Sequence, residues 1–249
     1  MIHYHGFPIF PEVAAVRAVR SGHAFVPFAR KQGFRTVLEV AQSFAVDNSA
    51  FSAWRSGEPI EDWEPFYAWI SEIHRYPAFD FAVVPDIVGG DEAANDALLA
   101  AWPWRDCAPW LGAPVWHLDE SLARLERLAL AWPRVCLGSA GEFATVGTPR
   151  WFNRMAEAMA VVCDRDGRPM CKLHGLRMLA PDVYRYFPFA SADSTNVARS
   201  VALDTRWTGS YAPASREARA QIVRERIEAF QAPTLWRREF APIQTDLLL

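Results

Sequence analysis

Two aspartates in distant parts of the chain, Asp47 and Asp193, have surroundings that suit glycosidic chemistry. Asp193 lies in FASADSTN, residues 189–196, among small and hydroxyl side chains with no lysine or arginine beside it. Such a carboxylate would remain an accessible nucleophile with space for a bulky substrate. Two carboxylates across a pocket suit cleavage at an anomeric carbon, because one attacks C1 of the sugar while the other moves protons. The competing interpretation makes Asp193 or Ser194 the N-cap of a following helix.

Other polar residues recur where strands are predicted to end, and they suit recognition of a flat polar heterocycle. Asp86 can accept from ring N–H and amino donors, His117 can meet a carbonyl, and Phe51 offers a face for stacking. Each has an ordinary alternative as a turn, a buried histidine or a core residue. The recurrence of polar residues at several strand ends favours a binding or catalytic site over these separate explanations. The strand-end residues are His5, Asp47 with Asn48 and Ser49, Asp86, His117, Gly138 with Ser139, His174 with Gly175, and Asp193.

Strands and helices alternate along the sequence, which predicts a parallel sheet with helical crossovers. About eight repeats in 249 residues suit a closed (β/α)8 TIM barrel, an α/β fold, as a single domain over residues 1–249. An open doubly wound sheet is the competitor, but YHGFPIF offers only one glycine after the first strand. A barrel would gather the strand-end residues at one mouth. The predicted strands are 2–5, 24–27, 43–46, 81–84, 114–118, 135–137, 170–174 and 187–190, and the predicted helices lie near 11–20, 29–34, 61–74, 91–102, 120–132, 149–163, 194–203 and 214–230.

The charge of the chain, −3, predicts no global attraction to nucleic acid, so phosphate contacts would have to be local. Arginines near the C-terminus are the candidates. Their helical spacing is also typical of a solvated face paired with glutamates, which is the simpler interpretation. The candidates are Arg199, Arg206, Arg216, Arg219, Arg224, Arg226, Arg237 and Arg238.

Composition predicts a folded protein in the cytoplasm. The chain is 51% hydrophobic and 22% charged, yet no apolar run approaches the roughly 20 residues of a membrane span. The N-terminus lacks a signal pattern, so we expect no membrane partner. The four cysteines have no CxxC spacing, which predicts reduced thiols and neither a disulfide framework nor a metal site. No cofactor is indicated.

Six sequence blocks resemble, in order, those of the tRNA-guanine transglycosylase superfamily, and more closely its small phage and bacterial DNA-modifying relatives. The blocks are VDNSAFS, VVPDIVGG, PVWHLDE, CLGSAGEF, KLHGLRM and FASADSTN. Together they extend over roughly residues 40–200. Members of that superfamily exchange a guanine for a 7-deazaguanine on a (β/α)8 barrel, through a covalent sugar–enzyme intermediate.

The resemblance implies a role for each candidate residue. Asp193 would be the nucleophile at C1 of the (deoxy)ribose, and Asp47 the general acid/base beside it. Phe51 would stack on the base, and Asp86 would bind its aminopyrimidine edge. The nucleotide would have to be flipped out or single-stranded to reach an acid inside a barrel. The remaining substrate-binding residues would be Asn48, Ser49, His117, Gly138, Ser139, His174 and Gly175.

Departures from the family pattern bear on the polymer substrate. The tRNA enzymes carry a zinc site of three cysteines and a histidine, whereas no cysteine follows Cys171 here. DNSAF also replaces a more glycine-rich segment. We therefore expect DNA rather than tRNA as the polymer, and a 7-deazapurine such as preQ0 as the incoming base. Two alternatives stay open, namely a hydrolase that releases the base and a non-catalytic binding subunit. A homodimer or another protein partner also stays open.

Overall fold

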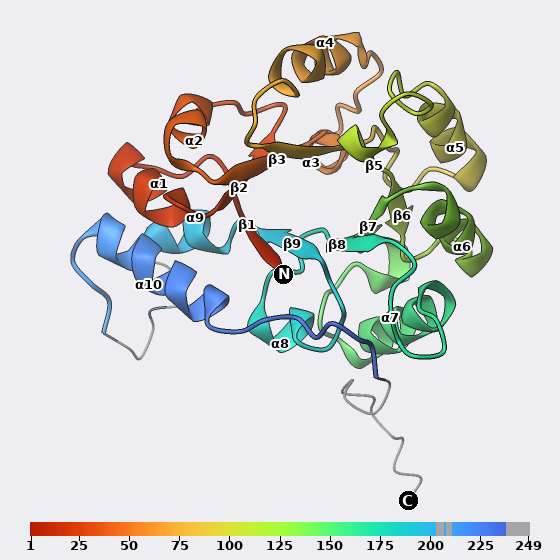
Figure 1. Cartoon of the computed structure of the whole chain (residues 1–249). Coiled ribbons are helices and arrows are strands. Elements are labelled where there is room, and N and C mark those ends of the chain that lie inside the picture. Colours follow the sequence, from red (N-terminus) through yellow and green to blue (C-terminus); the bar gives the residue numbers. More distant parts are fainter. Residues whose placement is uncertain (203–206, 208–210, 238–249) are drawn as a thin grey trace, which may run out of the picture.

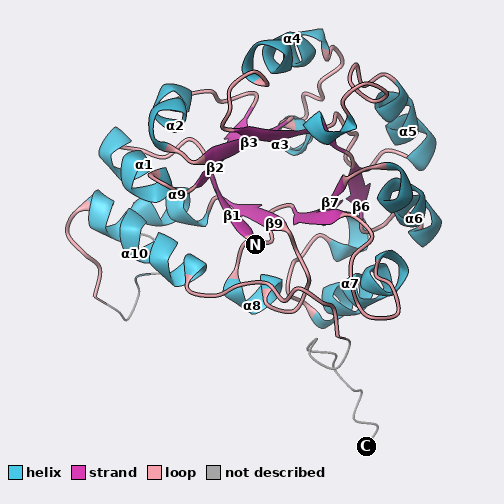
Figure 2. Cartoon of the chain, viewed as in Figure 1, coloured by secondary structure: helices cyan, strands magenta, loops and turns pink. Residues whose placement is uncertain are grey.

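The computed structural model describes residues 1–202, 207 and 211–237, which form a parallel β-barrel surrounded by helices (Figure 1). Figure 2 shows the strands as a central ring with the helices outside. The predicted α/β barrel is confirmed. Within the described residues the sheet has nine strands in the order β5-β4-β3-β2-β1-β9-β8-β7-β6. The strands are β1 Ile2–Gly6, β2 His23–Pro27, β3 Ser43–Asp47, β4 Phe79–Val83, β5 Gly112–Ala113, β6 Val115–His117, β7 Arg134–Gly138, β8 Lys172–Gly175 and β9 Ser191–Ser194.

The ring closes through one stretch of chain that is interrupted at Pro114. β5 pairs with β4, and β6, directly after the proline, pairs with β7. Proline has no N–H to donate to a ladder, which divides the strand in two. Its carbonyl still accepts from the Cys136 backbone N–H at 2.8 Å. The two outer edges of the sheet are therefore joined by the same short segment.

The helices cover the outside of the barrel, and several begin at the caps that the sequence indicates. Ser121 accepts from the Arg124 N–H, and Thr148 accepts from the Trp151 N–H with Pro149 at the first helical position. The helices are α1 Glu12–Val19, α2 Phe34–Val40, α3 Ala50–Ser56, α4 Glu64–Ile73, α5 Glu92–Ala100, α6 Leu122–Ala131, α7 Pro149–Val162, α8 Pro181–Tyr184, α9 Asn196–Val201 and α10 Arg216–Glu228, with 3-10 turns η1 Pro109–Leu111 and η2 Gly141–Phe143.

The last predicted strand, 187–190, is wrong, because the strand is β9, four residues further along. Phe187 and Phe189 are buried, but they pack in the shell between sheet and helices, where Phe187 stacks on Phe152 of α7. The apolar pattern of this segment therefore reflects burial against the helices and not a strand. Asp193 consequently lies inside β9, and the capping alternative for it is also wrong, since α9 has Thr195 as its N-cap.

The helices also differ from the predictions in places. The predicted helix near 29–34 is wrong, since α2 begins only after Gly33, whose φ of 82° ends the preceding turn. The short helices α3 and α8 were not predicted. Part of the range 194–203 lies outside the described residues, and α9 covers its beginning.

A small separate core fills the barrel interior below the mouth. Its members are large or apolar side chains that alternate with outward-facing residues along the strands. Their rings and methyl groups exclude water from the axis, so polar groups at the carboxyl ends of the strands rest on an apolar floor. The interior core consists of Tyr4, Phe25, Ala45, Phe81, Val83, Ala113, Val115 and Cys136.

Candidate active site

Strand register directs the predicted nucleophile into the barrel. Asp193 of β9 stands opposite Tyr4 of β1, and His174 of β8 stands opposite Cys136 of β7. Tyr4 and Cys136 both belong to the interior core. Neighbours in register share a face of a sheet, so Asp193 and His174 also face inward.

The same alternation places the second acid. Asp47 follows the interior residue Ala45 by two positions, and His117 follows the interior residue Val115 by two. Both are the last residues of their strands, β3 and β6. Because every strand pair is parallel, these ends lie at the same mouth as Asp193.

Asp47 has the electrostatics of a proton-transfer group. Burial and, to a smaller extent, the negative charges of Asp193 and Asp86 raise the pKa of its carboxyl to about 7. A backbone N–H from Ser49 and the charge of Arg177 oppose the shift. A carboxyl with a pKa near neutrality can both donate and accept a proton at working pH.

Asp193 is held from below by the backbone and by a histidine. It is 5% exposed, and its Oδ1 accepts the backbone N–H of Arg177 at 2.8 Å. The same oxygen lies 3.4 Å from Nε2 of His174, whose Nδ1 is 2.8 Å from the Ser191 hydroxyl. Burial lowers the pKa of His174, so this imidazole is neutral. His174 forms part of the floor between the rings of Phe25 and Phe81.

Asp86 is the centre of a buried hydrogen-bond network. Its Oδ1 accepts from Asn48 Nδ2 at 2.7 Å, and its Oδ2 lies 2.8 Å from His117 Nε2. Asn48 also donates to the Val84 carbonyl and accepts the Ala50 N–H, both at 2.8 Å. A carboxylate has about four lone-pair directions, so Asp86 keeps acceptor capacity for a ligand.

The pair of His117 and Asp86 makes stability depend on pH. Burial lowers the pKa of His117, but its hydrogen bond to Asp86 and the charge of that residue outweigh burial and raise it overall. A histidine with a raised folded pKa stabilises fully below about pH 6.5 and loses this contribution as pH rises through the folded pKa. We expect His117→Gln to lower the free energy of unfolding more at pH 6 than at pH 9, measured by urea denaturation.

A histidine outside the network provides the control for this prediction. His74, the C-cap of α4, contacts Trp104 and not the network. His74→Gln should leave the pH dependence of unfolding unchanged. An equal loss of stability at both pH values for His117→Gln would contradict the stabilising interaction of protonated His117 with Asp86.

Two predicted glycines are packed too closely by protein atoms for a side chain, and the neighbours of Gly175 belong to the shell between sheet and helices. A Cβ on Gly138 would lie 3.2 Å from Nδ1 of His117, and a Cβ on Gly175 would lie 2.9 Å from Met178. The predicted serines use their hydroxyls within the protein. Ser139 Oγ accepts from Trp151 Nε1 at 2.9 Å, and Ser49 Oγ accepts the Ala29 N–H at 3.1 Å. Each hydroxyl accepts one hydrogen bond in these contacts and keeps its O–H as a donor.

Arg177 is the site residue that sequence reasoning missed. Its guanidinium lies 3.7 Å from the ring centroid of Phe51, and its Nη2 donates to the Ser139 carbonyl at 3.2 Å. The sequence neighbours of Asp193 supply no cation, but the fold brings the charge of Arg177 close enough to interact with this carboxylate. The available signal was the position of Arg177 in KLHGLRM, directly after β8, where an arginine would reach the barrel mouth.

Some candidates lie elsewhere in the fold. His5 faces outward, and its Nε2 is 2.9 Å from Glu228 of α10. Arg219 is buried and donates to the carbonyls of Val201 and Pro213, while Arg224 pairs with Glu228. Arg224 is therefore paired with a glutamate as expected, whereas the expectation of a solvated position is wrong for Arg219, which is buried. Arg206 and Arg238 lie outside the described residues.

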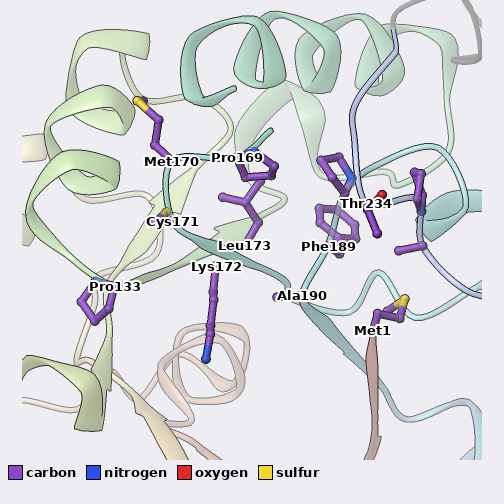
Figure 3. A pocket seen from close by; sticks show the side chains of 13 residues that line it. Met1, Pro133, Pro169, Met170, Cys171, Lys172, Leu173, Phe189, Ala190 and Thr234 are labelled. Carbon is purple, nitrogen blue, oxygen red and sulfur yellow. The ribbon is translucent and has the colours of Figure 1, made fainter. Parts of the chain in front are cut away.

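A surface depression of about 630 Å³ lies away from this mouth, and Figure 3 shows the side chains that line it. Met1 and Pro133, which precede β1 and β7, line it together with Lys172, the first residue of β8. Strand beginnings and strand ends are at opposite mouths of a parallel barrel. The depression is therefore separate from the candidate active site.

No protein-family model, no curated protein and no solved structure matches this chain. Within residues 1–202, 207 and 211–237, no cluster of three or more His, Cys, Asp or Glu side chains could hold a metal ion. No helix in that part of the chain has the length and apolar character needed to cross a membrane.

Proposed function

We propose that this protein is a base-exchange glycosyltransferase that replaces guanine in DNA with a 7-deazaguanine such as preQ0. One observation supports this most strongly. Asp47 and Asp193, far apart in sequence, meet at one barrel mouth, close enough for the charge of Asp193 to raise the pKa of Asp47. Acids placed in this way have environments suited to different roles in cleavage at a sugar carbon.

The proposed reaction has two displacements at the anomeric carbon. The Asp193 carboxylate attacks C1′ of the deoxyribose, and the C1′–N9 bond to guanine breaks with its electron pair passing to the base. Protonated Asp47 donates a proton to the departing guanine. The Asp47 carboxylate then removes a proton from the incoming base, whose nitrogen attacks C1′ and releases Asp193.

The base would be recognised by its edge and its face. Asp86, oriented by Asn48 and His117, would accept from the ring N–H and amino group of an aminopyrimidine edge. Phe51, half-buried on α3, would stack on the ring system. His174 would form part of the floor of the pocket, whereas Gly175 next to it faces the shell between sheet and helices.

Access to the acids limits the form of the polymer. Asp193 is only 5% exposed, so the mouth has to open and the nucleotide has to leave its helical stack to reach it. The lack of cysteines for the zinc site of tRNA enzymes supports DNA over tRNA. Single-stranded or locally opened DNA is therefore the preferred substrate.

Incubation with radiolabelled preQ0 or guanine tests this function. The protein is mixed separately with single-stranded DNA, duplex DNA and tRNA, and label in the polymer is measured. We expect incorporation into DNA, fastest for single strands. Labelling of tRNA alone would show that tRNA, and not DNA, is the polymer substrate. Release of free guanine without incorporation would identify a hydrolase, and neither outcome with any polymer would overturn the proposal.

A further inference from the structure

The contact between Arg177 and Phe51 is unusually close for this protein. At 3.7 Å it is the shortest arginine-to-ring distance among the described residues, where the next is Arg134 over Phe81 at 4.0 Å. The Arg134 pair is buried at the barrel floor, whereas Arg177 is exposed at the mouth. The Arg177 guanidinium therefore has solvent into which it can move.

The backbone of Arg177 is strained in a way that preserves this position. Its φ of 60° lies in the left-handed region, which disfavours side chains other than glycine. The strained peptide donates its N–H to Asp193, and the side chain donates to the Ser139 carbonyl. One residue thus contacts the predicted nucleophile, the predicted stacking ring and the turn after β7.

A guanidinium resembles the recognition edge of guanine in shape and donors. It is planar, stacks on aromatic faces and directs several N–H groups towards carboxylates. The aminopyrimidine edge of guanine likewise presents a ring N–H and an amino group on a flat frame. The positive charge of Arg177 interacts favourably with Asp193, Asp47 and Asp86. It therefore also offsets the mutual repulsion of these three carboxylates.

We propose that the Arg177 guanidinium occupies the base position of the free protein and that an incoming planar, N–H-rich base displaces it from Phe51. This inference rests on the proposed function, since it assigns the same stacking face to the base. One face of a phenyl ring holds one planar partner at contact distance. Base binding therefore includes the cost of moving Arg177 into solvent.

Arg177→Gly is the most informative variant. Glycine adopts the positive φ without strain and keeps the backbone N–H that Asp193 accepts. With no side chain to displace, free preQ0 or guanine should bind roughly fivefold more tightly, the effect expected for an exposed cation–π contact. Arg177→Lys keeps the charge but lacks the planar fork, so its affinity should lie between those of wild type and Arg177→Gly.

Calorimetric titration of preQ0 and guanine into wild type and both variants tests the displacement. Arg185→Ala is the matched control, because that guanidinium lies 4.9 Å from the Tyr186 ring, outside the site. Low-millimolar methylguanidinium should compete with the base for Arg177→Gly, whereas methylammonium should not. A merely structural arginine would show neither tighter binding nor this competition.

The outcomes separate the inference from the proposed function. Equal or weaker base affinity in Arg177→Gly, with exchange by wild type intact, overturns displacement alone. No base binding by any variant and no exchange by wild type overturns both. If Arg177→Gly fails to fold by circular dichroism, tighter base binding by Arg177→Lys supports the proposal, and unchanged affinity of that variant overturns it.

Discussion

Asp193→Asn is expected to abolish base exchange and the covalent DNA adduct, with a rate loss on the order of 10³-fold or more. Asparagine has the same shape, and its amide oxygen can still accept the Arg177 N–H that Asp193 now accepts. It has no carboxylate to attack C1′, so the sugar–enzyme ester cannot form. Label incorporation into DNA measures exchange, and a protein–DNA species on a denaturing gel measures the adduct.

The same substitution on the outer helices is the control for Asp193. Asp182 is exposed in the first turn of α8, so Asp182→Asn should exchange bases at the wild-type rate. Undiminished labelling by Asp193→Asn would show that Asp193 is not the nucleophile. Loss of activity in both variants would indicate a general effect of the substitution rather than a role at C1′.

Asp47→Asn is expected to slow exchange by about 10²–10⁴-fold, the usual contribution of a general acid or base. With a pKa of about 7, Asp47 supplies both its protonated and its ionised form near neutral pH. The wild-type rate should therefore be greatest near pH 7, and the variant should lose this maximum. Initial rates of label incorporation between pH 5 and pH 9 provide the measurement.

The same variant should be more stable than wild type at high pH. The ordinary pKa of an aspartate, 3.8, rises to about 7 in the fold, so between these values the folded state binds the proton more tightly. The free energy of unfolding therefore falls as pH rises from about 4 to about 7. A neutral asparagine avoids this loss, so Asp47→Asn should gain on the order of 2 kcal/mol at pH 8 and little at pH 4.

Urea denaturation at pH 4 and pH 8 checks this stability gain, with Asp182→Asn as the unaffected reference. A less stable Asp47→Asn at pH 8 would show that the carboxylate is favourable in the fold. A gain in stability with a loss of exchange is typical of an active-site charge that folding alone does not favour.

Local patterns predicted most of the barrel because they depend on near neighbours in sequence. The apolar run at 43–46 became β3, and the run at 135–137 became the middle of β7. Helix starts at Ser121 and Thr148 were predictable because each cap bonds a backbone N–H only three residues away. Strand-end polar residues followed from the same periodicity.

The segment around Asp193 was misplaced because its strand has little strand character of its own. Ser191–Ser194 is small and polar, and its place in the sheet comes from pairing with β1 and β8. The preceding apolar run looked more like a strand but packs outside the barrel. Strand preference reflects the surroundings of a side chain as much as its type.

The sequence by itself determined the alternation of strands and helices, and with it the barrel and the polar residues at its mouth. Only the tertiary structure decided that Asp193 lies inside a strand opposite Tyr4, that His5 faces the helices, and that Arg177 covers Phe51. Periodicity is a property of consecutive residues. Which side chains touch across the mouth depends on sheet register and ring closure, which join segments more than a hundred residues apart.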